Sequence, residues 1–148
     1  MGSIDRKALA RIAAECPGFQ ARATARALTR HYNASLRELH LTAEQFALLV
    51  GIGAQETPSI VELAASSGLD TTTLSRTVRI LEERGLVQSE GGRGRMGKRL
   101  QLTPAGELIV ADGVSIWRKT VADLTKRVGA ARLRAAQLAM AELAEAVS

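Results

Sequence analysis

One short segment places hydroxyls and guanidiniums together on one face of a predicted helix, an arrangement suited to hydrogen bonding with DNA. Between Asp70 and Gly85 apolar residues recur at helical spacing, with Leu74, Val78 and Leu81 on one face. The opposite face carries Thr71, Thr72, Ser75, Arg76 and Arg79. A solvent-exposed helix rarely carries a row of hydroxyl and guanidinium side chains without acidic partners. A helix that lies in a DNA major groove needs such side chains to contact bases and phosphates. We predict that these five residues contact DNA and that Arg76 makes a bidentate contact to guanine.

A glycine-rich basic stretch, which runs from Gly91 to Arg99, follows that helix. It contains no acidic residue and four basic ones, Arg93, Arg95, Lys98 and Arg99. Glycines let a hairpin tip fold back tightly and approach a phosphate closely. Alone, such a stretch is more often an ordinary solvated loop. After a capped recognition helix, it predicts a wing in which Arg93 enters a narrow minor groove and the other three lie on or near phosphates.

The elements that must hold these side chains are predicted from capping signals. Ser59 and Glu62 have capping-box spacing, which starts a first short helix, and Gly68 can end it in a left-handed conformation. Asp70 or Thr71 can cap the second helix. Two short helices joined by a glycine turn, and then a hairpin, form a winged helix-turn-helix.

Amphipathic helices are predicted on both sides of this unit. They cover 5–15, about 19–39, a stretch that starts at the Thr42–Gln45 capping box, 104 to about 128, and 131–147. A very short strand is expected within 55–59. The fold class is therefore mainly α with a small β-hairpin wing. We expect one chain over 1–148, with a DNA-binding lobe at 42–103 and dimerisation helices at 5–40 and 104–148.

The terminal helices carry more apolar surface than a single small lobe can cover, since such a lobe closes its core within roughly 60 to 80 residues. Pairing these faces across a two-fold axis would bury them and would place two recognition helices about one DNA turn apart. The alternative is that they fold back on their own subunit. A homodimer is the prediction.

Composition excludes several other classes of protein. The 148 residues suit one core, and the net charge of +5 is compatible with a nucleic-acid partner. No apolar run approaches the roughly 18 residues of a membrane span, and no secretory leader is visible, so the protein is expected in the cytoplasm. A single cysteine and two separated histidines, His31 and His40, predict no metal site. No catalytic motif and no cofactor-binding loop is found, so we expect neither an enzyme nor a cofactor.

These segments together resemble the MarR family of bacterial regulators. The resemblance is carried by ALTRHY, LTAEQFALLVGI, IVELAASSGLDTTTLSRTVRILEERGLV and LTPAGE, and it is densest between Ile60 and Gly106. It implies a homodimer that binds a near-palindromic operator in double-stranded DNA, usually as a repressor. It also implies release from DNA by small aromatic or amphipathic anions, which bind in a crevice between the dimer helices and the DNA-binding lobe.

The wing departs from the family pattern, which usually reads Asp-x-Arg-Asp-x-Arg. Arg93 matches the first arginine, but glycines Gly91 and Gly94 replace both aspartates and Met96 replaces the second arginine. Those aspartates help brace the arginine in the family. We therefore expect a looser and more basic wing, in which Arg95 does part of the work of the missing arginine.

The implied effector crevice should lie where the first long helix and the helix after the wing meet the DNA-binding lobe. The aromatic and arginine residues of those segments are the predicted lining, namely Phe19, Arg22, Arg26, Tyr32, Phe46 and Trp117. An arginine there would give an anionic ligand a permanently charged partner. Alternatively, Tyr32 and Phe46 are core residues, and the arginines are solvated or paired across the dimer.

Two further functions stay open on the same scaffold. Peroxide-sensing relatives carry a reactive cysteine at the start of the first long helix, and Cys16 lies near that position. It is either a reactive thiol of a redox-sensing regulator or a small buried apolar residue. The basic wing also fits a protein that binds any DNA duplex with similar affinity. The leading prediction is a sequence-specific regulator released by a ligand.

Overall fold

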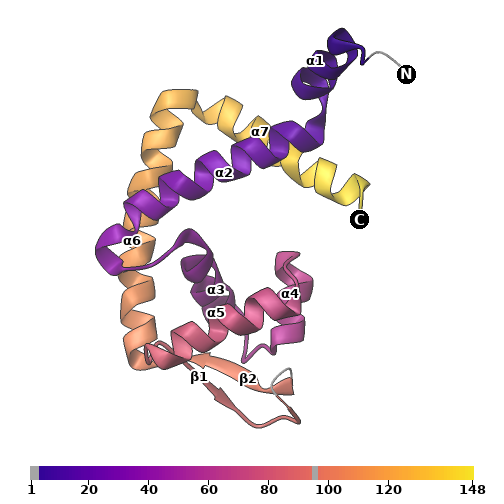
Figure 1. The fold of residues 1–148 in the computed structure, drawn as a ribbon. Helices are drawn as coiled ribbons and strands as arrows, with labels where there is room; N and C mark the ends of the chain where they lie inside the picture. The colour runs from indigo at the N-terminus through magenta and orange to yellow at the C-terminus, as the bar shows by residue number, and fades with distance from the viewer. Residues whose placement is uncertain (1–3, 95–96) are drawn as a thin grey trace.

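The computed structural model describes residues 4–94 and 97–148. Within them the chain is mainly helical, with one antiparallel hairpin, so the predicted fold class is confirmed (Figure 1). The elements are α1 (Arg6–Glu15), α2 (Pro17–Ser35), the 3₁₀-helix η1 (Arg37–Leu39), α3 (Ala43–Ala54), α4 (Ile60–Ser67), α5 (Thr71–Glu83), β1 (Val87–Glu90), β2 (Arg99–Leu102), α6 (Pro104–Val128) and α7 (Ala130–Ala146).

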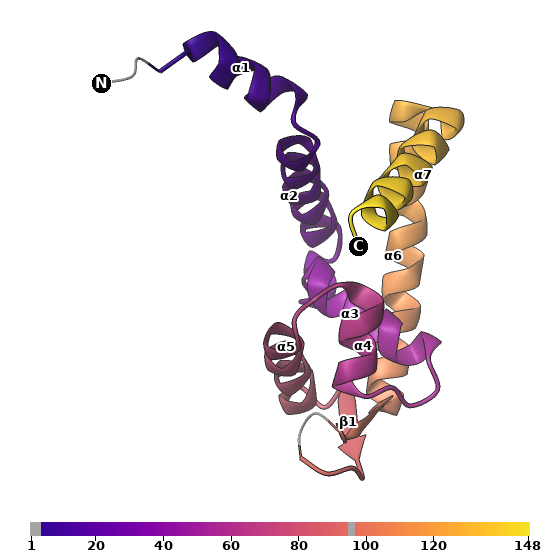
Figure 2. The same cartoon turned by 90° about the vertical axis from the view of Figure 1, so that its right-hand side faces the viewer.

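Two regions are visible in the fold. Helices α3, α4 and α5 gather with the hairpin at one end, and α6 runs away from them to the opposite end, where α7 turns back (Figure 1). Helix α2 runs across α6 at a large angle (Figure 1), and α1 protrudes beyond α2 (Figure 2). In the fully described helices α1, α2 and α7, no residue is buried.

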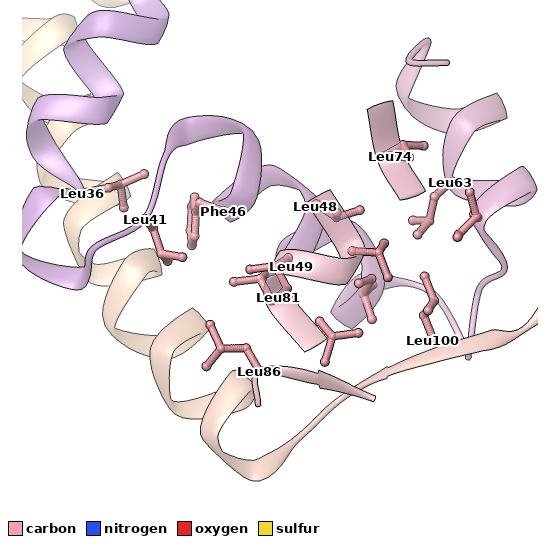
Figure 3. Packing of buried hydrophobic residues seen from close by; sticks show 14 residues of the cluster. Leu36, Leu41, Phe46, Leu48, Leu49, Leu63, Leu74, Leu81, Leu86 and Leu100 are labelled. Atoms are coloured by element: carbon pink, nitrogen blue, oxygen red, sulfur yellow. The ribbon is translucent and has the colours of Figure 1, made fainter. Parts of the chain in front are cut away.

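The hydrophobic core lies almost entirely in the region of α3, α4, α5 and the hairpin. Leu74, Val78 and Leu81 of α5 are at most 2% exposed, as their spacing predicted. They pack with residues of α3, α4 and both strands, and Leu36 and Leu41 close one end of the cluster (Figure 3). Phe46 belongs to the same cluster. This core fixes which face of α5 points outward.

The predicted caps are present. Asp70 accepts hydrogen bonds from the first turn of α5, and Asp5, which was not predicted as a cap, does the same for α1. The two capping boxes, at Thr42 and Ser59, are complete, with both reciprocal hydrogen bonds formed. Thr103 caps α6 directly before its N1 proline. Local sequence signals therefore set the starts of these helices.

The first long helix differs from the prediction of 19–39 at both ends. It begins at Pro17, because the fixed φ of proline suits the first helical position. It ends at Ser35, and the chain then tightens into η1 before His40 adopts a left-handed conformation with φ 52°. Leu36 at this junction is 1% exposed, so core packing determines where the helix stops. The predicted short strand is reduced to one β-bridge between Ser59 and Arg99.

Candidate nucleic-acid interface

Helix α5 separates an apolar face from a polar one. The carboxylate of Asp70 accepts hydrogen bonds from the Thr73 amide at 2.8 Å and from the Thr73 hydroxyl at 2.6 Å, which fixes the start of the helix. On the polar face, Thr72, Arg76 and Arg79 are exposed and Thr71 and Ser75 are half-buried. All five predicted contact residues thus lie in the first three turns of one helix, away from the core.

The two arginines of this face differ in their surroundings. Arg79 donates to Glu83 at 3.0 Å, so the expectation that this face lacks acidic partners is wrong at this position. The pair spans one helical turn and both side chains are largely exposed, so it contributes little to stability. A DNA phosphate can therefore replace Glu83 as the partner of Arg79. Among the described residues, none donates to or accepts from the Arg76 guanidinium. Arg76 is therefore the arginine of α5 that can bind a new partner without breaking an existing pair.

The hairpin is a narrow wing beside α5 (Figure 2). Its strands pair from Val87–Leu102 to Glu90–Arg99. At the tip Gly91, Gly92 and Gly94 all have left-handed φ values, between 62° and 74°. A Cβ at Gly92 would lie 2.0 Å from the Gly97 carbonyl oxygen, so only glycine allows the two sides of the tip to approach this closely.

The predicted wing contacts have different surroundings. Arg93 is exposed at the tip, and Lys98, directly before β2, is half-buried beside Ser89 and Glu82. Arg95, like Met96, lies outside the described residues. Arg93 is therefore more exposed than Lys98.

Arg99 is held by the helix-turn-helix itself. Its guanidinium Nη1 lies 2.6 Å from Glu62 Oε2 and 3.4 Å from the Thr57 carbonyl oxygen. The same Glu62 oxygen accepts the Ser59 amide at 2.7 Å, so one carboxylate caps α4 and anchors β2. On the other strand, the Ser89 hydroxyl donates to Glu82 of α5 at 2.6 Å. Two carboxylates of the helices thus hold the tip end of the paired strands against the helix-turn-helix.

Sequence reasoning assigned Glu62 to the capping box alone and missed its second role, because Arg99 is 37 residues away. Hydrogen bonds from the Ser59 backbone, and then from Arg99, lower the pKa of Glu62 below its ordinary value of 4.5. A carboxyl whose pKa is lower in the folded chain stabilises the fold above the ordinary value. That stabilisation is lost as the pH falls through the lowered pKa.

We expect Glu62→Gln to flatten the acid side of the stability profile. Glutamine can still accept the Ser59 amide, but it cannot be ionised. The difference in urea midpoint between wild type and variant should therefore be full above pH 4.5 and should shrink as the pH falls below it. Glu83→Gln, which removes an exposed pair within one helix, is the matched control. A wild-type–variant difference that is constant with pH would contradict the anchoring role of the Glu62 charge.

A crevice of about 510 Å³ lies where α2, α3 and α6 meet. Its lining includes Tyr32, Leu36, Phe46, Val50, Val114, Trp117 and two alanines of α3. Three of the six predicted lining residues, Tyr32, Phe46 and Trp117, are therefore brought together there. The other three do not line it. The Arg22 guanidinium lies 5.0 Å from the centre of the Phe19 ring near the start of α2, and Arg26 is exposed on the same helix.

Cys16 lies at the junction of α1 and α2, where it ends one helix and precedes the N1 proline of the next. It is half-buried and borders a shallow depression with Arg11, Ile12 and Glu15. Its redox reactivity stays a prediction. In the part of the chain that the structure describes, no three His, Cys, Asp or Glu residues are placed to share a metal ion. Within the same residues, no helix has the length and apolar character to span a bilayer.

Comparison with known proteins places this geometry in a family. The model of the MarR family matches residues 41–91, which hold the helix-turn-helix and the first strand of the wing. The M. tuberculosis transcriptional regulator MosR is 34% identical, over 90% of this chain and 98% of its own, with a TM-score of 0.77. The chain belongs to the MarR family. The resemblance read from its motifs is thereby confirmed.

Two other structures share the fold of this MarR-family chain at lower identity. A MarR variant from E. coli complexed with operator DNA is 22% identical, over 89% of this chain and 96% of its own, with a TM-score of 0.78. The PcaV transcriptional regulator from Streptomyces coelicolor is 21% identical over the full length of both chains, with a TM-score of 0.79. The MarR fold therefore extends over the terminal helices as well as the winged helix-turn-helix.

Proposed function

We propose that this MarR-family chain is a homodimeric regulator that binds a near-palindromic operator and is released from it by a small molecule. The observation that carries the proposal is the outward polar face of α5 beside an anchored basic wing, with an Arg76 that has no partner among the described residues. MosR and MarR have each been solved with DNA, which supports the same mode of binding here. No enzymatic activity is assigned to the chain.

The dimer is proposed from the terminal helices. Ile12 of α1 and Leu138, Met140 and Leu143 of α7 are each about half exposed or more, on helices in which no described residue is buried. Exposed apolar faces of this size are unfavourable for a monomer. The two-fold partner would cover them and set the spacing of the two α5 helices. Light scattering at several protein concentrations tests this assignment, and a monomer throughout would contradict it.

The DNA-binding function is tested by comparing duplexes. A site selected from random sequence should bind at least about a thousandfold more tightly than an unrelated duplex of the same length. Fluorescence anisotropy at fixed salt gives both affinities. A ratio near one would instead support the protein that binds any duplex alike, since phosphate contacts alone carry no sequence information.

The exposed wing arginine, Arg93, is expected to matter more than the half-buried Lys98. Arg93→Ala should weaken operator binding more than Lys98→Ala, because Arg93 is exposed at the tip whereas Lys98 is half-buried. Each lost phosphate contact should reduce the slope of log affinity against log salt by about one unit. Titrations at four salt concentrations measure this slope. If the double variant Arg93→Ala, Arg95→Ala binds as wild type does, the wing takes no part in binding.

A thiol-based regulator is the second candidate. Cys16 precedes the first turn of α2, at the end of a helix where negative charge is stabilised, and MarR from E. coli has been solved in an oxidised form. If Cys16 is the sensor, peroxide should weaken operator binding of wild type and leave that of Cys16→Ser unchanged. Equal responses of the two proteins would remove this candidate.

A further inference from the structure

The walls of the crevice between α2, α3 and α6 are almost entirely apolar. Leucine, valine, alanine and aromatic side chains form them, and the Tyr32 hydroxyl and the Trp117 indole N–H are the polar side-chain groups that its described lining contributes, neither of them charged. The volume of about 510 Å³ falls within the range of small-molecule sites. A ligand seated here would exchange water for apolar contacts over nearly all of its surface.

Charge decides which ligands this crevice accepts. A carboxylate placed in it would lose hydration without gaining a cation, and burial of an unpaired charge is strongly unfavourable. Arg22, which was expected to supply that cation, lies over the Phe19 ring, and Arg26 is exposed on α2 outside the lining. A neutral molecule incurs no such penalty, and the Tyr32 hydroxyl can hydrogen-bond to one hydroxyl or carbonyl group.

The crevice is also connected to the DNA-binding lobe. Phe46 belongs both to its wall and to the core, and Figure 3 shows it near Leu36 at one end of the core cluster. A Cβ at Gly113 of α6 would lie 2.3 Å from the Phe46 ring, so the ring and α6 are in close contact. Helix α3 in turn contacts α5. A ligand that displaces Phe46 must therefore shift α3 against α6.

From these observations we propose that the effector of this protein is an uncharged, largely apolar molecule, aromatic or alicyclic, with at most one or two polar atoms. The proposal rests on the proposed function, since it names the ligand class for the crevice of a ligand-released regulator. Such a ligand releases DNA by binding more tightly to the arrangement of α3 and α6 that separates the recognition helices wrongly.

The single tryptophan gives a direct reading of the site, because Trp117 lines the crevice. We would titrate the full-length protein with two pairs of probes, benzyl alcohol against benzoate and cyclohexylmethanol against cyclohexanecarboxylate, at neutral pH. Within each pair the alcohol should change Trp117 emission with at least roughly tenfold higher affinity than the carboxylate. A carboxylate that binds as tightly as its alcohol would overturn the proposal. So would the absence of any emission change with all four probes.

Two substitutions at one position sharpen the test. Val50 lines the crevice and is 38% exposed, so a longer side chain can keep its polar end near water. Val50→Arg should raise the affinity for both carboxylates by roughly tenfold or more, whereas Val50→Gln, of similar bulk but uncharged, should not. Equal gains in the two variants would contradict the charge argument.

Operator affinity is measured separately, with and without each alcohol, so that the two proposals fail in different ways. Alcohols that bind beside Trp117 and weaken operator binding support both. Alcohols that bind but leave operator affinity unchanged support the ligand class and contradict ligand release. Tight operator binding that only the carboxylates relieve supports regulation and overturns the neutral effector.

Discussion

Arg76→Ala is expected to weaken binding to the operator by about 5- to 150-fold, which corresponds to roughly 1 to 3 kcal/mol. The Arg76 guanidinium is exposed on the outward face of α5. Among the described residues it forms no hydrogen bond or ion pair that would have to break before it binds DNA. Its planar fork can bond to two acceptors on one guanine edge at the same time. The loss on an unrelated duplex should be smaller, because no such bidentate contact is formed there.

Arg79→Ala is the matched control, because Arg79 lies three positions further along the same face and is already paired with Glu83. This variant should lose affinity for operator and unrelated duplex about equally and should have a lower salt slope, as expected for a phosphate contact. Anisotropy titrations of both variants against both duplexes give the four ratios needed. Equal losses of Arg76→Ala on the two duplexes would assign Arg76 to the DNA backbone instead of to a base.

The sequence was sufficient wherever the determining interaction is local. Each cap joins residues two or three positions apart, so the starts of α3, α4, α5 and α6 could be predicted from spacing alone. The division of α5 into two faces follows from helical period in the same way. The left-handed conformation of Gly68 at the end of α4 was predicted because few other residues adopt it without strain.

Interactions between distant segments could not be predicted. The Arg84 guanidinium donates to the carbonyl oxygens of His40 and Leu39, at 2.9 and 3.4 Å, more than 40 residues away. These carbonyls end η1 and need a partner, so the end of η1 depends on a side chain at α5's C-cap. Helical period alone extended that helix to Leu39. The Glu62–Arg99 anchor was missed for the same reason.

The lining of the crevice could be predicted in part from the sequence. Aromatic residues are scarce in this chain, so Tyr32, Phe46 and Trp117 were natural candidates for a shared site. The arginines were included because the family favours anionic ligands, and the alternative that they are solvated fits the exposed Arg26. Tyr32 of α2 and Leu36, directly after this helix, are four positions apart, and Phe46 and Val50 are four apart on α3. This spacing was visible in the sequence and points to an apolar seam.

Gly106→Ala is expected to destabilise the fold strongly at the junction of α6 and the wing. Gly106 is buried in the first turn of α6, and a Cβ there would lie 2.0 Å from the Leu86 carbonyl oxygen and 3.1 Å from its carbon. That oxygen also accepts the Thr103 amide at 3.1 Å, so the start of α6 and the entrance to β1 are held against each other through backbone atoms. Backbone cannot rotate away as a side-chain end can.

The clash should therefore exceed the advantage of about 1 kcal/mol that alanine has over glycine in a helix. We expect a net loss of about 3 kcal/mol, at the upper end of overpacking effects. In a chain of this length, this lowers Tm by roughly 6 to 12 °C, and the comparison must be made at equal protein concentration because a dimer is expected. Gly53→Ala is the control, since its nearest contact is the flexible end of Leu102 at 3.0 Å. Gly53→Ala should leave Tm almost unchanged.

A Tm for Gly106→Ala within about 2 °C of wild type would show that α6 can move away from β1, and the wing would then not be fixed through this contact.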